Sequence, residues 1–262
     1  MNRKCFVLTS AALVAGCLVT SANAAVVFLA GTSSGSTTTW TQYASLADMA
    51  ANTGGSAAGS SGSVLNTDGV WTDGSYVYKT TADAIGIGGS YNNIYVRYNT
   101  LADLNSDTGG TVINMTQGMY YNEDVIAGGT NGWIFRTASF GGGTNVGMYA
   151  FNDMANLLAN TYFYANGFTA GAVDGANQFW AYDGTYYGSN VVGGVVTGFT
   201  TWPSGPDLYN GTNATTISSS VGFDTNAHFL AIDSSLIGTV PAPSAIALLG
   251  LAGVGMSRRR RA

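Results

Sequence analysis

The chain is poor in positive charge. Six of its nine Lys and Arg residues lie near the two ends, at Arg3, Lys4 and Arg258 to Arg261, and only three stand between residues 25 and 239. All 14 carboxylates fall in that central part, which therefore carries a net charge of about −11. Such a charge repels phosphate backbones, so we expect no nucleic-acid partner.

Histidine and cysteine are scarcer still. Cys5 and Cys17 both precede residue 25, which leaves the central part without a disulfide or a thiolate metal site. His228 is the single histidine, and we expect it in an exposed turn between two strands, not as the base of a catalytic triad. A site built on several His or Cys ligands is impossible, and we expect no cofactor.

The first 24 residues form a predicted secretory signal peptide. An apolar run over 5–19 follows the basic start, and Ala22 and Ala24 give a small-residue cleavage pattern ahead of Ala25. A cut before Cys17 would instead make a lipoprotein, but apolar residues continue past that cysteine and favour cleavage after Ala24. We therefore expect an exported protein.

The last 23 residues combine three features. Pro241-Ala242-Pro243 comes first, an apolar run over 245–256 follows, and the cluster Arg258, Arg259, Arg260 and Arg261 ends the chain. Twelve apolar or glycine residues are too few for a comfortable bilayer span, which needs about 20. The arginines would stay on the cytoplasmic side and hold the end of the chain at the inner membrane during export.

Together these features resemble the PEP-CTERM sorting signal of exported bacterial proteins. The resemblance covers residues 240–262. It implies an exosortase-type enzyme that removes the tail, and a destination at the surface or in the extracellular matrix of a Gram-negative bacterium. The family's usual glutamate is absent, because Ala242 stands between the two prolines. An uncleaved C-terminal membrane anchor is the alternative.

Residues 25–239 are expected to form one domain, because about 215 residues can bury a sizeable core. Short aromatic and β-branched runs alternate there with Gly, Asn and Asp, and a long helical periodicity is missing. The sequence therefore predicts an all-β domain.

An internal repeat narrows the fold. Three segments align without gaps: WTQYASLADM (40–49), YVRYNTLADL (95–104) and MYAFNDMANL (148–157). Each has an aromatic at its fourth place, a hydroxyl or carboxylate two residues later, and a polar residue three beyond that. This is close to a capping box, so each copy predicts a strand that runs into one or two helical turns. A strand over 195–202 is followed by Pro203-Ser204-Gly205-Pro206, which we interpret as a degenerate copy or a plain loop.

Four predicted hairpins alternate with these capped strands, over 69–80, 119–137, 179–189 and 222–233. The repeat period of about 54 divides the domain into about four units. The first capped strand (26–49) and the last hairpin (222–233) would together complete one unit, which hides the free edges of a ring. We predict a small β-propeller of about four blades closed by its N- and C-terminal strands. A β-sandwich or jelly roll is the alternative.

Carboxylates carry the remaining catalytic possibility. A glycosidase needs two acids about 5 to 10 Å apart, and Glu123-Asp124 is the only adjacent acidic pair. Most other acids precede Gly or occupy the capping place, so we interpret them as structural. Asp103, Asn105 and Asp107 resemble the start of a Ca²⁺ loop, but the glycine comes one place late and the other repeat copies lack the pattern. We therefore expect no metal site.

Aromatic side chains are the best candidates for binding a polysaccharide, since they offer flat faces and hydroxyls. The candidates are Tyr76, Tyr78, Tyr91, Tyr95, Trp133, Trp180, Tyr182, Tyr186 and Tyr187. In a propeller, alternate members would instead fill the core between blades, and we favour that interpretation.

Three functions follow from the sequence. The first, which we favour, is a non-catalytic surface or extracellular-matrix protein, held transiently at the inner membrane by its tail and associated with exopolysaccharide. The second is a carbohydrate- or ligand-binding propeller with a pocket on the ring axis. The third is a glycan-active enzyme that uses paired carboxylates.

Overall fold

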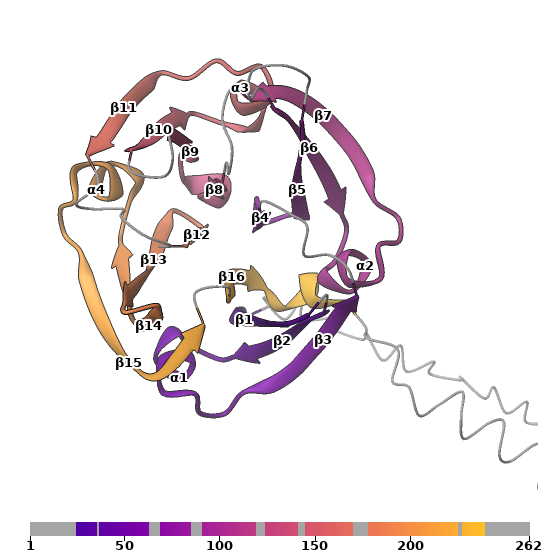
Figure 1. The fold of residues 1–262 in the computed structure, drawn as a ribbon, viewed down its shortest axis with the longest axis vertical. Coiled ribbons are helices and arrows are strands. Elements are labelled where there is room, and N and C mark those ends of the chain that lie inside the picture. Colours follow the sequence, from indigo (N-terminus) through magenta and orange to yellow (C-terminus); the bar gives the residue numbers. More distant parts are fainter. Residues whose placement is uncertain are drawn as a thin grey trace, which may run out of the picture.

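Four antiparallel sheets surround a common axis in the computed structural model of the chain (Figure 1). The structure describes residues 25–35, 37–62, 69–84, 91–118, 124–140, 145–169, 178–224 and 227–238. The arrangement is that of a four-bladed β-propeller, so the predicted fold class is confirmed and the sandwich alternative is wrong. Ala22, Ala24 and the sorting tail lie outside the described residues, whereas Ala25 is the first residue described.

Each blade has four strands, which are named in order from the axis outward. Blade 1 contains β16 (His228–Asp233), β1 (Val26–Ser34), β2 (Thr37–Tyr43) and β3 (Ser56–Gly62). Blade 2 contains β4 (Gly69–Thr72), β5 (Val77–Ala84), β6 (Tyr91–Tyr98) and β7 (Thr111–Gly118). Blade 3 contains β8 (Asp124–Ala127), β9 (Ile134–Phe140), β10 (Asn145–Phe151) and β11 (Tyr164–Thr169). Blade 4 contains β12 (Phe179–Tyr182), β13 (Thr185–Val192), β14 (Val195–Trp202) and β15 (Thr215–Asp224).

Three of the four predicted hairpins are present. They are β4–β5, β8–β9 and β12–β13, the inner halves of blades 2, 3 and 4. The hairpin expected over 222–233 is wrong, because β15 is the outer strand of blade 4 whereas β16 pairs with β1 in blade 1. The terminal strands therefore close the ring as predicted, but a single C-terminal strand closes it and not a hairpin.

A helical turn follows the third strand of every blade. These turns are α1 (Leu46–Ala51), α2 (Leu101–Ser106), α3 (Met154–Leu158) and α4 (Gly205–Asn210). The side chain at each N-cap accepts a hydrogen bond from the backbone N–H three residues later, and the four caps are Ser45, Thr100, Asp153 and Ser204. In α1 the Ser45 hydroxyl also donates to the Asp48 carboxylate at 2.7 Å. The predicted strand-cap-helix unit is confirmed.

Helix α4 corrects the interpretation of residues 203–206 as a loop. Ser204 follows Trp202 by two residues and Asp207 follows Ser204 by three, which is the spacing of the other copies. Pro206 lies in the first turn of the helix, where its missing N–H costs no hydrogen bond. The fourth copy is therefore complete.

A residue with left-handed backbone ends each helical unit, nine positions after the aromatic of the repeat. The φ angles are 50° at Asn52, 51° at Asp107, 53° at Asn160 and 64° at Gly211. These residue types adopt this conformation at the lowest cost. In the first copy the Tyr43 hydroxyl donates to Asn52 Oδ1 at 2.8 Å. The repeat thus extends to the C-terminal end of each helix.

Helices and register shifts protect three of the four outer strands, β3, β7 and β15. Helix α1 contacts β15 of the neighbouring blade, α2 contacts β3, and α3 contacts β7. The Ser219 and Ser220 hydroxyls donate to the Ala50 carbonyl at 3.1 and 3.3 Å. The pairings β2–β3, β6–β7 and β14–β15 each contain a register shift. Covering elements and bulges keep edge strands from pairing with other chains, which matters here because the outer strands carry little charge.

The core lies between the blades, in four clusters. In β16, Leu230 and Ile232 enter the cluster between blades 1 and 2, whereas Phe229 and Ala231 enter the one between blades 1 and 4. Successive side chains of a strand point to opposite faces, so each blade is buried on both sides. One inner strand thereby supports two of the four clusters.

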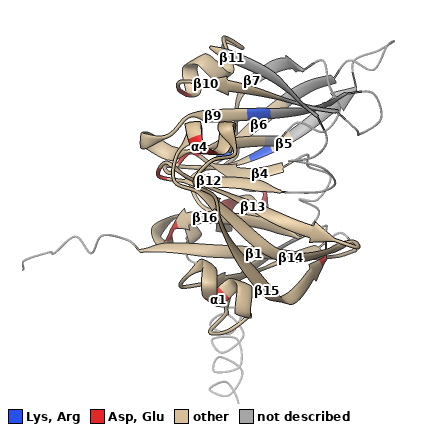
Figure 2. Ribbon diagram, turned by 90° about the vertical axis from the view of Figure 1, so that its left-hand side faces the viewer, with Lys and Arg blue, Asp and Glu red and all other residues tan. Residues whose placement is uncertain are grey.

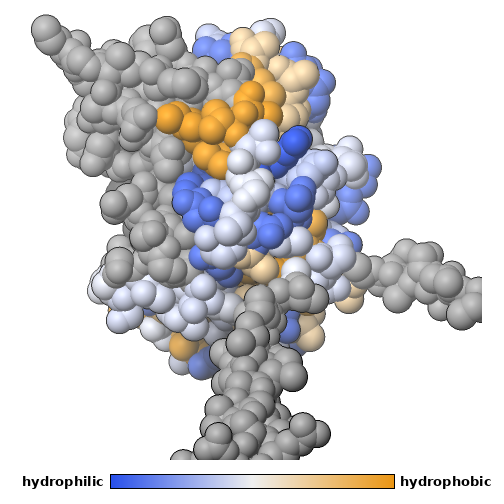
Figure 3. Space-filling model, turned by 90° about the vertical axis from the view of Figure 1, so that its right-hand side faces the viewer, coloured by the Kyte–Doolittle hydropathy of each residue, from blue (hydrophilic) through white to orange (hydrophobic). Residues whose placement is uncertain are grey.

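The surface is sparsely charged. Figure 2 shows acidic residues mainly at the ends of strands and helices. Among the coloured residues of the flank in Figure 3, hydrophilic ones predominate, with one larger hydrophobic area near the top and smaller ones below it. Large exposed hydrophobic residues include Val112, which is 60% exposed, and Val192, which is 68% exposed. Within the described ranges, no helix has both the length and the apolar character needed to cross a bilayer.

Candidate functional site

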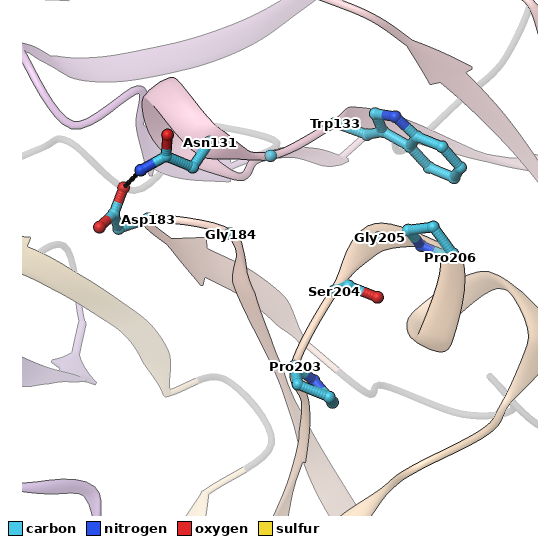
Figure 4. A pocket seen from close by; sticks show the side chains of 9 residues that line it. Asn131, Trp133, Asp183, Gly184, Pro203, Ser204, Gly205 and Pro206 are labelled. Carbon is cyan, nitrogen blue, oxygen red and sulfur yellow. Dashed lines mark hydrogen bonds between the residues drawn. The ribbon is translucent and has the colours of Figure 1, made fainter.

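A pocket of about 290 Å³ opens between blades 3 and 4 (Figure 4). Its lining comes from the β8–β9 turn, the β12–β13 turn and the start of α4. The lining residues are Asn131, Gly132, Trp133, Asp183, Gly184, Pro203, Ser204, Gly205 and Pro206. These segments meet because blades 3 and 4 are neighbours in the ring, so the pocket is a product of the closed fold.

One end of the pocket is polar. Asn131 is the last residue of the short helix η1 (Gly129–Asn131), and its Nδ2 donates to Asp183 Oδ1. Asp183 and Gly184 have φ angles of 44° and 82°, and two left-handed residues are what a two-residue type I′ hairpin turn requires. The turn places an exposed carboxylate beside an exposed amide, as Figure 4 shows. This end therefore offers both donors and acceptors of hydrogen bonds.

Tyr186 of β13 fixes the two turns against each other. Its hydroxyl donates to the Trp133 carbonyl at 2.6 Å, and the Gly184 N–H donates to the Gly128 carbonyl. A Cβ atom at Gly128 would lie 2.3 Å from the Tyr186 oxygen, so only glycine fits there. Burial raises the pKa of Tyr186, which keeps its phenol protonated as a donor.

The other end of the pocket is aromatic. Trp133 is half-buried, and Gly205 lies so close that an added Cβ would be 2.9 Å from the indole Cε3. The Phe163 ring lies 5.0 Å from the Trp133 ring, centroid to centroid, and is 46% exposed. Pro206 is exposed beside them. Trp133 and Phe163 thus form an aromatic surface that runs from the pocket to the solvent.

Ser204 serves the helix cap. Its hydroxyl accepts from the Asp207 N–H at 3.2 Å and donates to the Asp207 carboxylate. Hydrogen bonds from Ser204 and then from Asn213 hold the pKa of Asp207 below its ordinary value. The Ser204 hydroxyl is therefore engaged on both sides, and the arrangement suits binding better than nucleophilic attack.

Most of the candidate aromatics fill the core between blades. The buried ones are Tyr78, Tyr95, Trp180, Tyr186 and Tyr187. Tyr76, Trp133 and Tyr182 are half-buried, and the side chain of Tyr91 lies outside what the structure describes. Of the whole set, only Trp133 lines the described pocket. The preferred interpretation as core is confirmed for the buried members.

The described carboxylates form hydrogen bonds at caps and turns. Asp73 Oδ1 accepts from the backbone N–H groups of Ser75 and Tyr76 at 2.8 and 2.9 Å. Asp107 accepts from Tyr98 and from Lys79, and these bonds lower its pKa. Glu123 lies outside the described residues, as does the side chain of Asp124, so a catalytic pair of these two acids stays an alternative.

The two acids of the sequence that resembles a Ca²⁺ loop serve the two ends of α2, and Asn105 lies between them within the helix. The Asp103 carboxylate accepts from the Thr100 hydroxyl at 2.9 Å, and Asp107 is the C-cap. No cluster of three His, Cys, Asp or Glu residues suited to a metal occurs among the residues described. Capping explains the acidic spacing that suggested calcium.

His228 does not lie in an exposed turn, in contrast to the prediction. It is the first residue of β16, where it is half-buried and pairs with Gly31. Its ring lies 6.4 Å from the Trp40 ring, centroid to centroid. Burial lowers the pKa of His228 below 6.5.

Both ends of the described chain leave the ring on the pocket face. A turn joins the first and second strands of blades 2 to 4, and in blade 1 the same position holds the paired residues Val26 and Asp233. Burial raises the pKa of Tyr182, and the charges of Asp233 and Asp183 raise it further. Asp233 at the end of β16 and Asp183 in the pocket turn thus both act on Tyr182, whereas Gly238 lies against Thr100 of blade 2.

The sequence pointed to few of the pocket residues. Trp133 is one of the candidate aromatics, and the Asp183-Gly184 pair predicts only a turn. The signal for the α4 side of the pocket was the Ser204 to Asp207 spacing, which two prolines obscured. Nothing in the local sequence indicates that these three segments meet.

Comparison with known proteins adds no relative. No family model matches the chain, and neither does any curated protein or solved structure at a significant level.

Proposed function

We propose that this chain is an exported, non-catalytic protein of the cell surface or extracellular matrix, delivered by its signal peptide and sorting tail and retained with exopolysaccharide. The observation that carries the proposal is the position of the chain ends. The sheets begin at Val26 and close at Asp233, and Gly238 lies against Thr100 at the base of α2. The described strands and clusters use no residue of either terminal signal, so both can be removed without opening the ring.

The hydrogen bonds of the carboxylates at caps and turns support a non-catalytic, structural role for the domain. Asp48, Asp103 and Asp207 accept from cap hydroxyls, and Asp153 is itself a cap. Asp73 and Asp183 hold turns. Acids engaged in this way stabilise the repeat and are not arranged as a pair across a cleft.

The position of the ends also bears on delivery. The described chain ends on the pocket face, so we expect a chain still held at the inner membrane by Arg258 to Arg261 to present this face to the membrane. Removal of the tail by an exosortase-type enzyme then frees the pocket face for a partner in the matrix.

Expression of the full chain in a Gram-negative host with an exosortase-type system tests the proposal. We expect a surface-exposed product whose intact mass corresponds to a start at Ala25 and an end near residue 240. Replacement of all four terminal arginines by serine should leave the protein undelivered. Recovery of the chain from the cytoplasm with both ends intact, or normal display of the serine variant, contradicts the proposal.

The non-catalytic part has its own test. A glycan-active enzyme that used Glu123 and Asp124 would lose turnover in the Glu123→Gln variant. We expect the purified wild-type chain to release no reducing ends from polysaccharides of the host. Turnover that disappears in Glu123→Gln would establish the enzyme instead.

A further inference from the structure

We propose that the pocket between blades 3 and 4 binds one unit of an uncharged polysaccharide. Asn131 and Asp183 contact its hydroxyl groups, while Trp133 and Phe163 contact the apolar faces of its sugar rings. This inference rests on the proposed association with exopolysaccharide, and it adds the site and the class of glycan.

The two ends of the pocket match the two kinds of surface on a sugar. A pyranose has an apolar face of C–H groups and a rim of hydroxyls that donate and accept hydrogen bonds. The Asn131 amide and the Asp183 carboxylate supply a donor and acceptors at one end. The Trp133 and Phe163 rings supply rigid apolar area at the other end. Recognition by a few placed polar groups beside aromatic area is the general pattern of small-ligand sites.

The size and exposure of the pocket favour a unit within a chain. Its volume of about 290 Å³ lies at the lower end of ligand sites, which hold about 300–1,000 Å³. Asp183, Pro203 and Pro206 on its rim are exposed. Phe163 continues the aromatic surface outward, so sugar units on either side of the bound one can follow the surface of the ring.

Charge selects against acidic glycans. The described lining contains Asp183 and no Lys or Arg. The cations of the described chain are engaged in other places: Lys79 pairs with Asp107 at 3.3 Å, Arg97 lies 4.4 Å from the Tyr76 ring centroid, and Arg136 is buried. A uronic acid or sulfated sugar would meet Asp183 and a domain charge of about −11 without a neutralising partner. The occupant is therefore uncharged.

Calorimetric titration of the purified full-length chain tests the proposal. The probes are neutral hexasaccharides (cellohexaose, maltohexaose and mannohexaose) and, as the charged counterpart, hexagalacturonate at low ionic strength. We expect at least one neutral probe to bind and hexagalacturonate not to bind. Phe163→Ala and Asn131→Ala should each lower the affinity for the neutral probe by about five- to tenfold, as truncation of central binding residues does. Both side chains are exposed, so the variants should remain folded.

Tyr162→Ala is the matched control. Tyr162 is 46% exposed, as Phe163 is, but it lies against Tyr149, 5.1 Å between ring centroids, on the side of blade 3 that faces blade 2. We expect the Tyr162→Ala variant to bind the neutral probe with the affinity of the wild type. The proposal is overturned if no neutral probe binds, if hexagalacturonate binds more tightly, or if Tyr162→Ala weakens binding as much as Phe163→Ala. The variant with four terminal serines should bind normally, so a failure of delivery and a failure of this site are separate results.

Discussion

Blade 1 differs from blades 2 to 4 in how its two innermost strands are connected. In blades 2 to 4 the two innermost strands are consecutive and a turn joins them. In blade 1 they are β16 and β1, from opposite ends of the chain. Six residue pairs, from Val26 with Asp233 to Gly31 with His228, replace the covalent turn together with a 2.9 Å hydrogen bond from Ser234 N–H to Ala25 O.

This difference shows that the repeat alone does not close the ring. Closure needs the pairing of two distant segments, whose entropy cost grows only slowly with the length of the intervening chain. The side chains of β16 offset that cost, because they enter the two clusters on either side of blade 1. The closing strand is thus the place where local folding of the blades becomes one cooperative structure.

Deletion of residues 228–238 should have the largest effect. Loss of β16 removes side chains from two of the four clusters and exposes β1, so we expect cooperative thermal unfolding to disappear in circular dichroism. A circular permutant is the control. It joins residues 238 and 25 by a short linker and opens the chain in the exposed turn after Gly74. The permutant should melt cooperatively, and a cooperative melt of the deletion variant would contradict the role of β16 in closure.

A single core truncation sharpens the same comparison. Ile232 in β16 and Ile126 in β8 are both fully buried on first strands of their blades. Each change to alanine should lower the free energy of unfolding by about 2–5 kcal/mol in denaturant titrations. Amide exchange should separate the two variants. Ile232→Ala should accelerate amide exchange in β1, the neighbour of β16. Ile126→Ala should not accelerate exchange in β9 to the same extent, because a turn ties β9 to β8. Equal acceleration in β1 and β9 would mean that blade 1 and blade 3 are held in the same way.

Removal of a helix cap should lower the free energy of unfolding by a smaller amount, which should be the same in each blade. Ser45→Ala and Ser204→Ala each remove an N-cap hydrogen bond, which costs about 1 kcal/mol. Ser60→Ala, on an exposed position of β3, is the control and should change the free energy of unfolding little. A Ser204→Ala variant as stable as wild type would mean that α4 does not behave as a copy of α1.

The smallest effect concerns pH. The pKa of His228 is lowered by burial in the folded chain, so the unfolded chain binds more protons between that value and 6.5. Stability should therefore fall as the pH drops through about 6.5 and level off below the folded pKa. Asp107 and Asp207 have lowered pKa values, below 3.8, so their titration affects stability only at lower pH. Denaturant titrations should show a lower free energy of unfolding at pH 5.5 than at pH 7.5 in the wild type. The His228→Gln variant should not show this decrease.

The repeated unit could be predicted from the sequence because its stabilising contacts are local. Ser45, Thr100 and Asp153 cap helices through residues three positions away, and the aromatic at the end of each strand is close to its own cap. The helical turn of the fourth copy is harder to predict, because Pro203 and Pro206 are typical of loops and make the copy look degenerate. Proline in the first turn of a helix is nevertheless favourable, so the Ser204 to Asp207 spacing was the more informative signal.

The closing strand and the pocket could not be predicted in the same way. Two strands near each other in sequence are typical of a hairpin, and the alternation of β15 and β16 does not show that they belong to different blades. The pocket depends on the meeting of Asn131, Asp183 and Ser204, whose segments are more than 20 residues apart in the chain. Their proximity follows from the order of blades around the ring, which no local pattern specifies.

Hydrogen–deuterium exchange of the purified chain tests the closed ring most directly. We predict that the amides of Val27 to Ala30 and of Phe229 to Ile232 exchange together and as slowly as those of β8 and β12, because β16 pairs with β1 and contacts the inner strands β4 and β12 around the axis. Fast exchange at both chain ends, with protection retained in β8 and β12, would show an open ring and contradict closure by β16.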